Sequence, residues 1–406
     1  MISPKQKKIL AFPYTGYDAL ICDGAVRSGK TSIMAWAFIW WAMDNFNCQR
    51  FGICGKTVDS ATKNIIMPFM GMSLAQERYC IRWRRADKVM EVRRGNVVNL
   101  FEVFGGKDEA SFALIQGRTL AGVLLDEVVL MPRSFVEQAA ARCSVDGARM
   151  WFSCNPGSPN HWFYNEWITQ HKKRNALYLH FEMRDNPGLS EKTIQRYENM
   201  YTGVFYERYI KGRWIPAEGL IYPMFDDSCI VDTLPEKGDY YISCDYGTMN
   251  PFSAGLWRFD GKTATRIREY YYSGRDTKKS KTDEEYATEI DNLRAGLPIK
   301  YVVVDPSAAS FIEVLRRHNY AVQKAKNNVA DGIMLTARFL STGKIKIARE
   351  CKDCIREFGL YRWDEKAGED RPIKENDHAM DDTRYFVYTV MRHKVDKQEY
   401  RPIWST

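Results

Sequence analysis

The sequence predicts an α/β protein of two domains. Apolar runs with the length of buried strands alternate with helix-like segments along most of the 406 residues. A glycine-rich loop at 24–31 joins the first such run to an apolar helix-like segment, and this strand–loop–helix unit opens the first domain. The alternation of strand-like and helix-like segments is interrupted at 212–219, a stretch that contains glycine and proline. We therefore place the first domain at 1–218, with a linker or lid region at about 185–218, and the second at 219–406.

The composition is that of an ordinary globular protein, with 45% hydrophobic and 27% charged residues. A net charge of +8 permits a polyanionic partner without requiring one. The ten cysteines form no framework, and the one C-x-x-C pair, Cys351 and Cys354, lacks the second pair of a zinc site. Residues 1–10 are lysine-rich, and the longest apolar run, 33–43, is shorter than the ~20 residues of a membrane span. We therefore expect a reducing, cytoplasmic setting without membrane association.

The loop at 24–31 reads GAVRSGKT and matches the phosphate-binding pattern G-x-x-x-x-G-K-[ST] at every fixed position. Its glycines let backbone N–H groups face phosphate oxygens, and the helix N-terminus adds positive charge. Lys30 is expected to reach the terminal phosphates of ATP and Thr31 to bind Mg²⁺. A chance glycine-rich turn is the alternative. The predicted nucleotide-binding residues of the loop are Gly24, Arg27, Ser28, Gly29, Lys30 and Thr31.

The short apolar strand at 121–125 ends in Asp126 and Glu127, which supply the acidic half of an ATPase site. We expect Asp126 to hold Mg²⁺ through water and Glu127 to polarise the attacking water. An apolar strand that ends in two acids is common by itself. Together with a complete phosphate loop upstream, it becomes a strong indication of ATP hydrolysis.

Five further residues are weaker candidates for the same site. Gln6, upstream of the loop, is placed to hold adenine, although a surface glutamine fits equally well. Ser153 and Asn155 follow another strand and are candidates to sense the γ-phosphate, and an ordinary strand-to-turn exit is the alternative. Arg118 from a neighbouring subunit, or Arg27 from within the loop, is a candidate to deliver positive charge to the γ-phosphate. Either arginine can also be a plain surface residue.

The segment 78–94 is rich in arginine, with Tyr79 and Trp83 interleaved. Contact with a DNA backbone is one interpretation. We favour the other, a solvated β-hairpin face with a turn at Gly95 and Asn96.

The second half predicts a β-β-β-α-β order followed by further alternating elements and a final helix. Acids stand at the ends of these elements, at Asp245, at Asp305 and within 377–382. On a helix His378 and Asp381 are three residues apart and share a face. The predicted elements are strands at 239–247, 252–259, 264–272 and 301–306, a helix at about 283–295, and an apolar helix that begins near 377.

Carboxylates gathered from two strands and a helix repel one another unless a cation neutralises them. Oxygen ligands of this kind suit Mg²⁺ or Mn²⁺, and two such ions can clamp a phosphodiester. Each acid by itself also fits a turn or a helix N-terminus. For the constellation as a whole we favour a ribonuclease H-like nuclease.

In the order of these motifs the sequence resembles the large subunit of a tailed-phage terminase along nearly its whole length. GAVRSGKT resembles the Walker A loop of that family, LLDE its Walker B strand and SCNP its coupling motif. The acids in CDYG, VDPS and DHAMDD resemble those of its nuclease. The resemblance implies a P-loop NTPase domain of the ASCE type followed by a ribonuclease H-like nuclease domain.

The resemblance also implies a function and partners. Family members translocate double-stranded DNA into a procapsid through the portal and cut concatemeric DNA with a metal-dependent endonuclease. The partners that the resemblance implies are a portal protein and a terminase small subunit. It also implies a homo-oligomeric ring on the portal, with a monomer in solution left open, and a location in the host cytoplasm. By the match to DHxxD, Asp381 is the third metal ligand beside Asp245 and Asp305, His378 is its neighbour, and Asp382 is the fallback.

Two positions depart from the commonest family pattern, Ala25-Val26 in the loop and Cys154-Asn155 in the coupling motif, and the second leaves the role of Asn155 open. Two other functions remain as alternatives. One is a P-loop DNA-remodelling ATPase whose C-terminal domain binds but does not cut nucleic acid. The other is a structural portal-associated protein with a relic ATP site.

Overall fold

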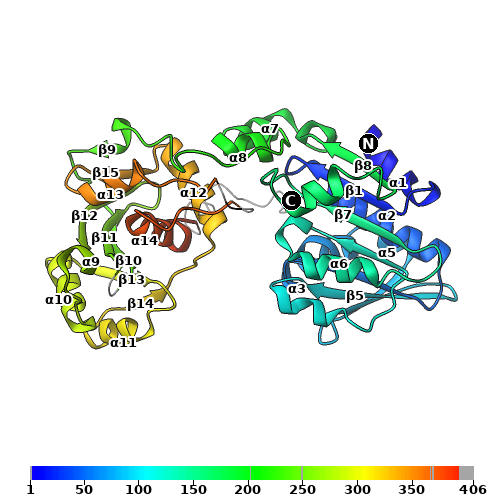
Figure 1. Cartoon of the computed structure of the whole chain (residues 1–406), viewed down its shortest axis with the longest axis horizontal. Coiled ribbons are helices and arrows are strands. Elements are labelled where there is room, and N and C mark those ends of the chain that lie inside the picture. Colours follow the sequence, from blue (N-terminus) through cyan, green and yellow to red (C-terminus); the bar gives the residue numbers. More distant parts are fainter. Residues whose placement is uncertain (1, 202, 248–249, 366, 368–369, 393–406) are drawn as a thin grey trace. The chain divides into compact units, whose positions relative to one another are not determined.

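The computed structural model describes residues 2–201, 203–247, 250–365, 367 and 370–392. The chain divides into two compact units, drawn in Figure 1. The first comprises Met1–Met200 and Val204–Pro216, and the second Tyr201–Gly203 and Ala217–Thr406. Each unit has its own sheet with helices packed against it, which confirms the predicted α/β class.

The first unit contains an eight-stranded sheet in the order β3-β4-β5-β2-β6-β7-β1-β8. The six strands from β5 to β8 in this order run parallel, and β3 and β4 add an antiparallel hairpin at one edge. The strands are β1 (Ala19–Gly24), β2 (Arg50–Gly55), β3 (Cys80–Arg84), β4 (Val89–Arg94), β5 (Val97–Gly105), β6 (Gly122–Leu125), β7 (Arg149–Ser153) and β8 (Ala176–Phe181).

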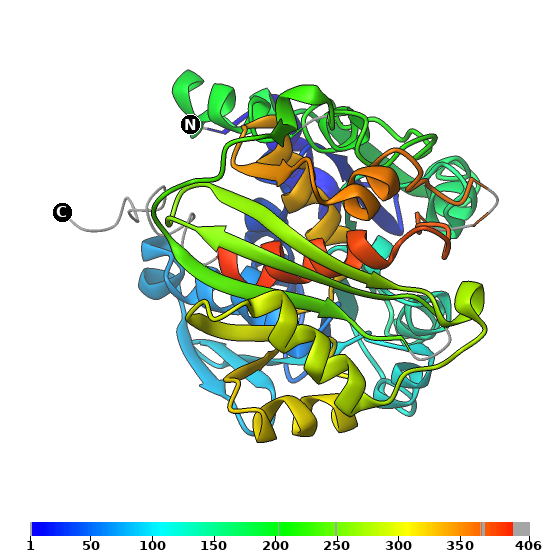
Figure 2. The same ribbon diagram turned by 90° about the vertical axis from the view of Figure 1, so that its left-hand side faces the viewer.

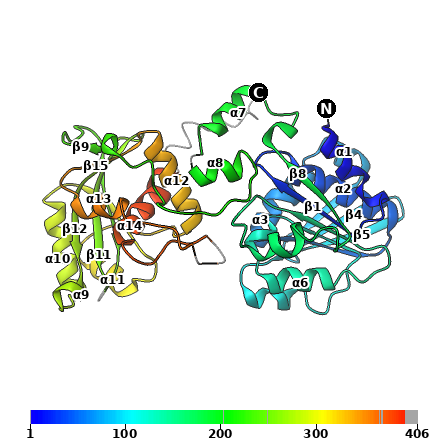
Figure 3. The same cartoon turned by 45° about the horizontal axis from the view of Figure 1, so that its top comes forward.

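Helices cover both faces of this sheet because its central strands are apolar on both faces. In β1, Leu20 and Cys22 face the layer that contains α1 and α2, whereas Ala19 and Ile21 face the layer that contains α6. Figure 3 shows α6 on the other side of the strands from α1 and α2. The helices are α1 (Pro4–Ala11), α2 (Lys30–Asn45), α3 (Val58–Ala61), α4 (Met67–Met70), α5 (Ser73–Arg78), α6 (Arg133–Ala141), α7 (Glu191–Glu198) and α8 (Gly203–Tyr209).

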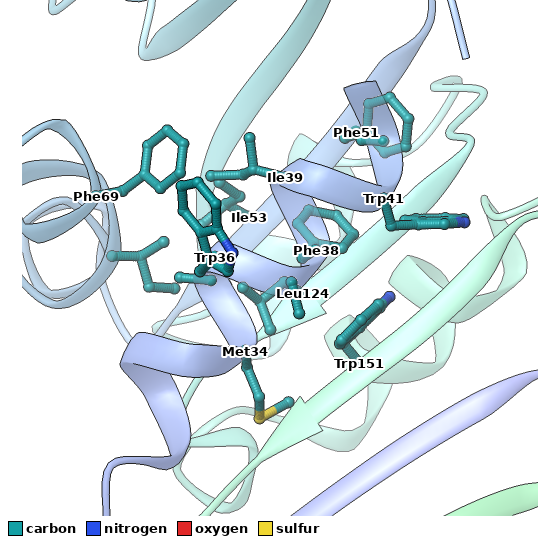
Figure 4. Close-up of a cluster of buried hydrophobic side chains, with 14 of the residues drawn as sticks. Met34, Trp36, Phe38, Ile39, Trp41, Phe51, Ile53, Phe69, Leu124 and Trp151 are labelled. Atoms are coloured by element: carbon teal, nitrogen blue, oxygen red, sulfur yellow. The ribbon is translucent and has the colours of Figure 1, made fainter. Parts of the chain in front are cut away.

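The core beside α2 is unusually aromatic. Phe38 lies edge-on to Trp151, with ring centroids 5.8 Å apart, and Trp41 packs against Phe51 at the same separation. Figure 4 shows these side chains between the helix and the strands. Such pairs stabilise a core beyond the area that they bury. This packing fixes α2, and with it the loop at its N-terminus.

The arginine-rich segment 78–94 forms the edge hairpin, as predicted. Trp83 and Met90 are paired across the strands and pack toward the core, while Arg82 and Arg93 lie on the exposed face. The chain turns between β3 and β4 and again at Gly95-Asn96 between β4 and β5.

The second unit contains a seven-stranded mixed sheet in the order β14-β13-β10-β11-β12-β15-β9. β11 runs antiparallel to both of its neighbours, β10 and β12, and the other neighbouring strands pair in parallel. The strands are β9 (Ile230–Val231), β10 (Asp239–Asp245), β11 (Phe252–Phe259), β12 (Ala264–Tyr272), β13 (Ile299–Val304), β14 (Val322–Lys324) and β15 (Ile345–Ala348). The helices are α9 (Gly274–Thr277), α10 (Asp283–Arg294), α11 (Ala309–Arg317), α12 (Val329–Ser341), α13 (Lys352–Phe358) and α14 (His378–Phe386).

The two faces of this sheet have different chemistry. Ile242 and Cys244 of β10 face the apolar layer of α10 and α11. The alternate residues Tyr241 and Ser243 face α14, which continues as a π-helical turn to Met391. Figure 2 shows α14, in red, lying along one face of the strands. Asp245 continues the alternation and therefore also lies on the α14 side of the sheet.

Candidate nucleotide and nuclease sites

The phosphate loop begins at the carboxyl end of β1 and ends at the N-terminus of α2. Gly24 (φ 120°) lies so close to Phe181 that a Cβ there would be 1.9 Å from the carbonyl oxygen, and Gly29 (φ 81°) is the N-cap of α2. Arg27 adopts a left-handed backbone (φ 58°) without being glycine. Its carbonyl accepts a hydrogen bond of 2.8 Å from Asn186. The loop therefore has the tight curl that the motif predicts.

Lys30 is buried within this loop. Its Nζ donates to the carbonyl oxygens of Gly24 (3.0 Å) and Ala25 (2.8 Å), to Ser28 Oγ (3.3 Å) and to Asn155 Oδ1 (3.1 Å). Burial lowers the pKa of the ammonium group. Asn155 is thus brought to the loop from the end of β7.

Asp126 joins the loop to the acidic strand. Its Oδ1 accepts from Thr31 Oγ1 at 2.9 Å and from Ser153 Oγ at 2.5 Å, and its Oδ2 accepts from Asn64 at 3.2 Å. The side chain is 3% exposed. Glu127 follows in a left-handed conformation (φ 56°), in which β-carbon sterics cost about 1 kcal/mol or more. The sequence did not indicate Asn64, which no motif contains.

The N-terminal helix lies against the loop. Ser3 and Gln6 form a capping box on α1, and a Cβ at Gly29 would come within 2.7 Å of Gln6 Nε2. Lys5 pairs with Asp185 at 2.7 Å. Gln6 therefore lies beside the loop, where an adenine-binding residue is expected.

Asp23, which precedes the loop, is fully buried and accepts three hydrogen bonds. The donors are His180 (2.9 Å), Tyr178 (3.1 Å) and the indole of Trp214 (2.6 Å). In addition, Val26 N–H of the loop donates to Tyr209 O at 2.8 Å. The segment predicted as a linker or lid therefore touches the phosphate loop directly.

Arg118 is not brought to this loop. It lies before β6, whereas the loop and Asp126 lie beyond the opposite ends of the parallel strands. Its guanidinium pairs with Glu102 at 3.3 Å and is 47% exposed. If Arg118 acts on a γ-phosphate, the nucleotide must therefore be bound to another subunit.

In the second unit, Asp245 and Asp305 leave the sheet side by side. Cys244 of β10 is paired in parallel with Val304 of β13, so the next residue of each strand is one of the two acids. The parallel register brings both carboxylates to the same edge, as the sequence predicted. Their side chains line a cavity of about 1040 Å³ together with Asp377, His378, Asp381, Tyr385, Arg356 and Lys374.

Helix α14 supplies a partner to each of the three predicted ligands. His378 Nδ1 lies 2.8 Å from Asp245 Oδ2, and Tyr385 donates to Asp305 Oδ2 at 2.6 Å. Arg384 pairs with Asp381 at 2.9 Å. Because the three donors come from one helix, the position of α14 sets the orientation of the whole acidic cluster.

The surroundings shift the pKa values of the two strand-end aspartates in this cluster in opposite directions. Burial raises the pKa of Asp245 to about 7, although the hydrogen bond with His378 opposes the shift. Burial also tends to raise the pKa of Asp305, but hydrogen bonds from Ser307 and Tyr385 outweigh it and hold that pKa below its ordinary value. Burial disfavours the charged form of His378, but the contact with Asp245 prevails and raises its pKa.

The donor set fits Mg²⁺ or Mn²⁺ in kind, because hard cations prefer carboxylate oxygens. Among the described residues, however, no group of three His, Cys, Asp or Glu side chains is already arranged to hold a metal ion. Asp245, Asp305 and Asp381 instead accept hydrogen bonds from α14. A carboxylate oxygen can accept a hydrogen bond and bind a cation at once, so these donors are compatible with a metal.

The fallback ligand Asp382 does not belong to this cluster. It is fully buried on the sheet side of α14, where Arg266 binds both of its oxygens. Ser243 and Ser253 donate to the same carboxylate. Consecutive residues on a helix point about 100° apart, so only one of the two aspartates can face the cavity, and it is Asp381.

Sequence reasoning also missed residues that support the cluster. Glu357 accepts from the backbone N–H of Ala379 and from Tyr271, each at 2.7 Å, and so caps the first turn of α14. Arg384 and Tyr385 were not indicated either. The signal that could have found Tyr385 is its spacing of four residues from Asp381, which puts both on one helix face.

Comparison with known proteins identifies the family. A family model described as terminase large subunit, T4likevirus-type, N-terminal, matches residues 21–227. The large terminase of a thermophilic bacteriophage, known from its crystal structure, is 47% identical, with 96% of this chain and 99% of that chain covered and a TM-score of 0.92. The chain belongs to the terminase large subunit family.

Two further relatives agree with this membership. A structure of the same thermophilic phage terminase in complex with ADP is 46% identical over 96% of this chain and 100% of that chain, with a TM-score of 0.90. The terminase large subunit of Escherichia phage T5 is 22% identical over 329 residues, which are 76% of this chain and 73% of the relative. The fold is thus that of a phage large terminase. Among the helices of the described residues, none has the length and apolar character needed to cross a bilayer.

Proposed function

We propose that this protein is the motor and nuclease of phage DNA packaging. The first unit, with the boundary near 217, hydrolyses ATP to move double-stranded DNA into a procapsid, and the second cuts concatemeric DNA. The observation that carries the nuclease half is the convergence of Asp245, Asp305 and Asp381 on one cavity from two strands and a helix. The ATPase half is supported by the contacts among Lys30, Asp126 and the phosphate loop.

In the ATPase site, loop backbone N–H groups and Lys30 bind the phosphates, and Gln6 contacts the adenine. Thr31 and Asp126 would hold Mg²⁺, an ion that would supply positive charge to the phosphates. Glu127 positions the attacking water, and Asn155, already bonded to Lys30, responds to the γ-phosphate. Arg118 has access only to a neighbouring subunit's site, whereas Arg27 remains the candidate from within the loop.

In the nuclease site, Asp245, Asp305 and Asp381 would hold one or two Mg²⁺ or Mn²⁺ ions. Such ions activate water and stabilise the leaving oxygen of a phosphodiester. His378 orients Asp245 through the 2.8 Å contact. Arg356 and Lys374 line the same cavity, where their charges favour the approach of a polyanionic backbone.

The partners follow from this function. They are double-stranded DNA, a portal protein, a terminase small subunit and other copies of this chain in a ring on the portal. The setting is the host cytoplasm, with transient docking on the procapsid. A net charge of +8 is compatible with DNA as the substrate.

Separate substitutions in the two units test the proposal. Lys30→Ala should lower ATP turnover by about 100-fold or more, because the phosphates lose their main cation, and should leave Mn²⁺-dependent plasmid cleavage intact. Asp305→Asn should abolish Mn²⁺-dependent plasmid cleavage and leave ATP turnover intact. Turnover that is unchanged in Lys30→Ala would remove Lys30 from the mechanism.

A second candidate is an ATPase whose second unit binds DNA without cutting it. The observation in its favour is that no three of the described side chains are already arranged around a metal ion. Plasmid DNA that remains intact with wild-type protein at saturating Mn²⁺, while the protein still binds it in a gel-shift assay, would support this candidate over the nuclease.

A further inference from the structure

Both oxygens of the Asp305 carboxylate are held in place. Oδ1 accepts from the backbone N–H of Ser307 at 2.7 Å and from Ser307 Oγ at 2.5 Å. Oδ2 accepts from the hydroxyl of Tyr385 at 2.6 Å. The Ser307 contacts belong to a local turn, whereas the tyrosine reaches Asp305 from a helix 80 residues further along the chain.

Tyr385 is itself fixed by its neighbours on α14. Its side chain is 3% exposed, and the Arg384 guanidinium lies 4.9 Å from its ring centroid. Arg384 in turn donates to Asn327 O at 3.1 Å and pairs with Asp381. A Cβ at Gly332 of α12 would come within 2.5 Å of Arg384, so the missing side chain leaves room for this arrangement. The hydroxyl thus has one well-defined position.

We propose that Tyr385 is a positioning residue for the divalent-cation site, and that it acts by fixing the rotation of the Asp305 carboxylate. The proposal deepens the nuclease function proposed above and rests on it. A free aspartate carboxylate rotates about its terminal bond, and this freedom is lost when a cation binds. The bond from Tyr385 to Oδ2, together with the Ser307 bonds to Oδ1, removes that freedom in advance and leaves the second lone pair of Oδ2 available to a cation in the cavity that Asp305 lines.

A tyrosine suits this role better than a charged donor. A lysine or arginine at the same place would neutralise Asp305 and compete with the cation. The phenol donates one hydrogen bond and carries no charge, so the carboxylate keeps its full attraction for Mg²⁺ or Mn²⁺. Asp381 has the opposite arrangement, because its partner Arg384 is charged.

Mn²⁺ binding to the full chain, measured by calorimetry, tests the proposal. Tyr385→Phe should weaken binding by about 10- to 100-fold, the usual effect of removing a hydrogen-bond partner of a metal ligand. The matched control is Tyr388→Phe on the same helix. It removes a similar tyrosine–aspartate bond, from Tyr388 to Asp331 at 2.9 Å, outside the cavity, and should change Mn²⁺ affinity less than about 2-fold.

Two further measurements separate positioning from a general structural role. In plasmid cleavage, Tyr385→Phe should raise the Mn²⁺ concentration needed for half-maximal rate, and saturating Mn²⁺ should restore most of the rate. In an Asp305→Asn background, Tyr385→Phe should cause no further change in the residual Mn²⁺ binding by Asp245 and Asp381, because Tyr385 acts only through the Asp305 carboxylate. The thermal midpoint of each variant shows whether the second unit is folded.

The outcomes are distinguishable. Unchanged or tighter Mn²⁺ binding in Tyr385→Phe, with wild-type binding intact, overturns the role of Tyr385 and leaves the nuclease function standing. An equal loss in Tyr388→Phe also overturns it, because the effect would then come from the helix as a whole. If the wild-type chain neither binds Mn²⁺ nor cuts DNA, the nuclease function itself fails, and the role of Tyr385 fails with it.

Discussion

At the scale of single residues, the partner that faces an aspartate decides what it can do. Asp245 is buried beside His378 and has a pKa of about 7, whereas Ser307 and Tyr385 hold the pKa of Asp305 below its ordinary value. The pKa values of two carboxylates on adjacent strands are therefore shifted in opposite directions. The difference arises from the burial of Asp245, which outweighs the opposing bond with His378, and from the hydrogen bonds that Ser307 and Tyr385 donate to Asp305.

The adjacent aspartates of α14 give a sharp test at this scale. Asp382→Asn should lower the unfolding free energy of the second unit by about 3–5 kcal/mol, because the buried Arg266 would lose the carboxylate that binds it through both oxygens and, among the described residues, keep only Glu269 at 3.5 Å. For a unit of this size that is a fall of about 10 °C in the thermal midpoint, measured by calorimetry. Asp381→Asn should abolish Mn²⁺ binding, which Asp382→Asn should leave intact in the folded unit. Because Asp381→Asn also removes the partner of the buried Arg384, it lowers the midpoint as well, and Mn²⁺ binding is the measurement that separates the two aspartates. The reverse pattern would restore Asp382 as the metal ligand.

The sequence could place both aspartates on a helix but could not choose between them. The decisive contact comes from Arg266 on β12, a segment that was predicted as a strand without a role for this arginine. Asp245 and Asp305 were predictable because each ends an apolar strand. Their donors on α14 were not, since no motif contains Arg384 or Tyr385.

At the scale of elements, His318 joins two helices of the second unit. Its Nδ1 lies 2.8 Å from Asp291 and its Nε2 3.0 Å from Glu284, both on α10, while His318 itself caps the C-terminus of α11. The contacts with the two carboxylates raise its pKa above 6.5. Arg317 also pairs with Glu284, so the helix junction carries two cations against two acids.

This arrangement predicts a pH-dependent contribution to stability. Because the folded-state pKa of His318 is raised, its stabilising effect is complete below the unfolded value of 6.5 and is lost as the pH rises through the folded value. His318→Gln should therefore lower the thermal midpoint of the second unit by about 1–2 °C at pH 5.5 and hardly at all at pH 8.5. A difference that grows toward high pH would contradict the assignment.

The elements themselves were largely predictable from sequence. Apolar runs located β1, β6 and β7 of the first sheet and β10 to β13 of the second, but not β8 or β9, and the glycine turn located the β4–β5 hairpin. The order of strands was not predictable, because pairing such as that of β12 with β15 depends on contacts between segments far apart in the chain. For the same reason the position of Arg118 could not be foreseen.

At the scale of the whole molecule, the chain consists of two units with separate cores. Each sheet with its helices buries its own apolar residues, and the phosphate loop and the acidic cavity belong to different units. A ligand of one unit should therefore stabilise that unit alone.

Calorimetry with a nucleotide tests this independence. Mg-ADP at about 100 times its dissociation constant should stabilise the first unit by about 2.7 kcal/mol and raise its thermal midpoint by about 5–10 °C. The transition of the second unit should not move, and Lys30→Ala should reduce the shift of the first. A single transition that moves as a whole would show that the two units unfold together.

The ion pair between Arg266 and Asp382 also limits how this protein can change over generations. Among the described residues, losing Asp382 leaves the buried Arg266 with only the longer contact to Glu269, and losing Arg266 leaves Asp382 buried without a cation, so substitution of either position first costs stability. A lineage must replace both at once or neither. An acid next to the nuclease aspartate can therefore persist for reasons unrelated to cutting DNA. In any set of relatives, an acid retained at the position of Asp382 would therefore reflect its pairing with a buried arginine and not a role in DNA cleavage.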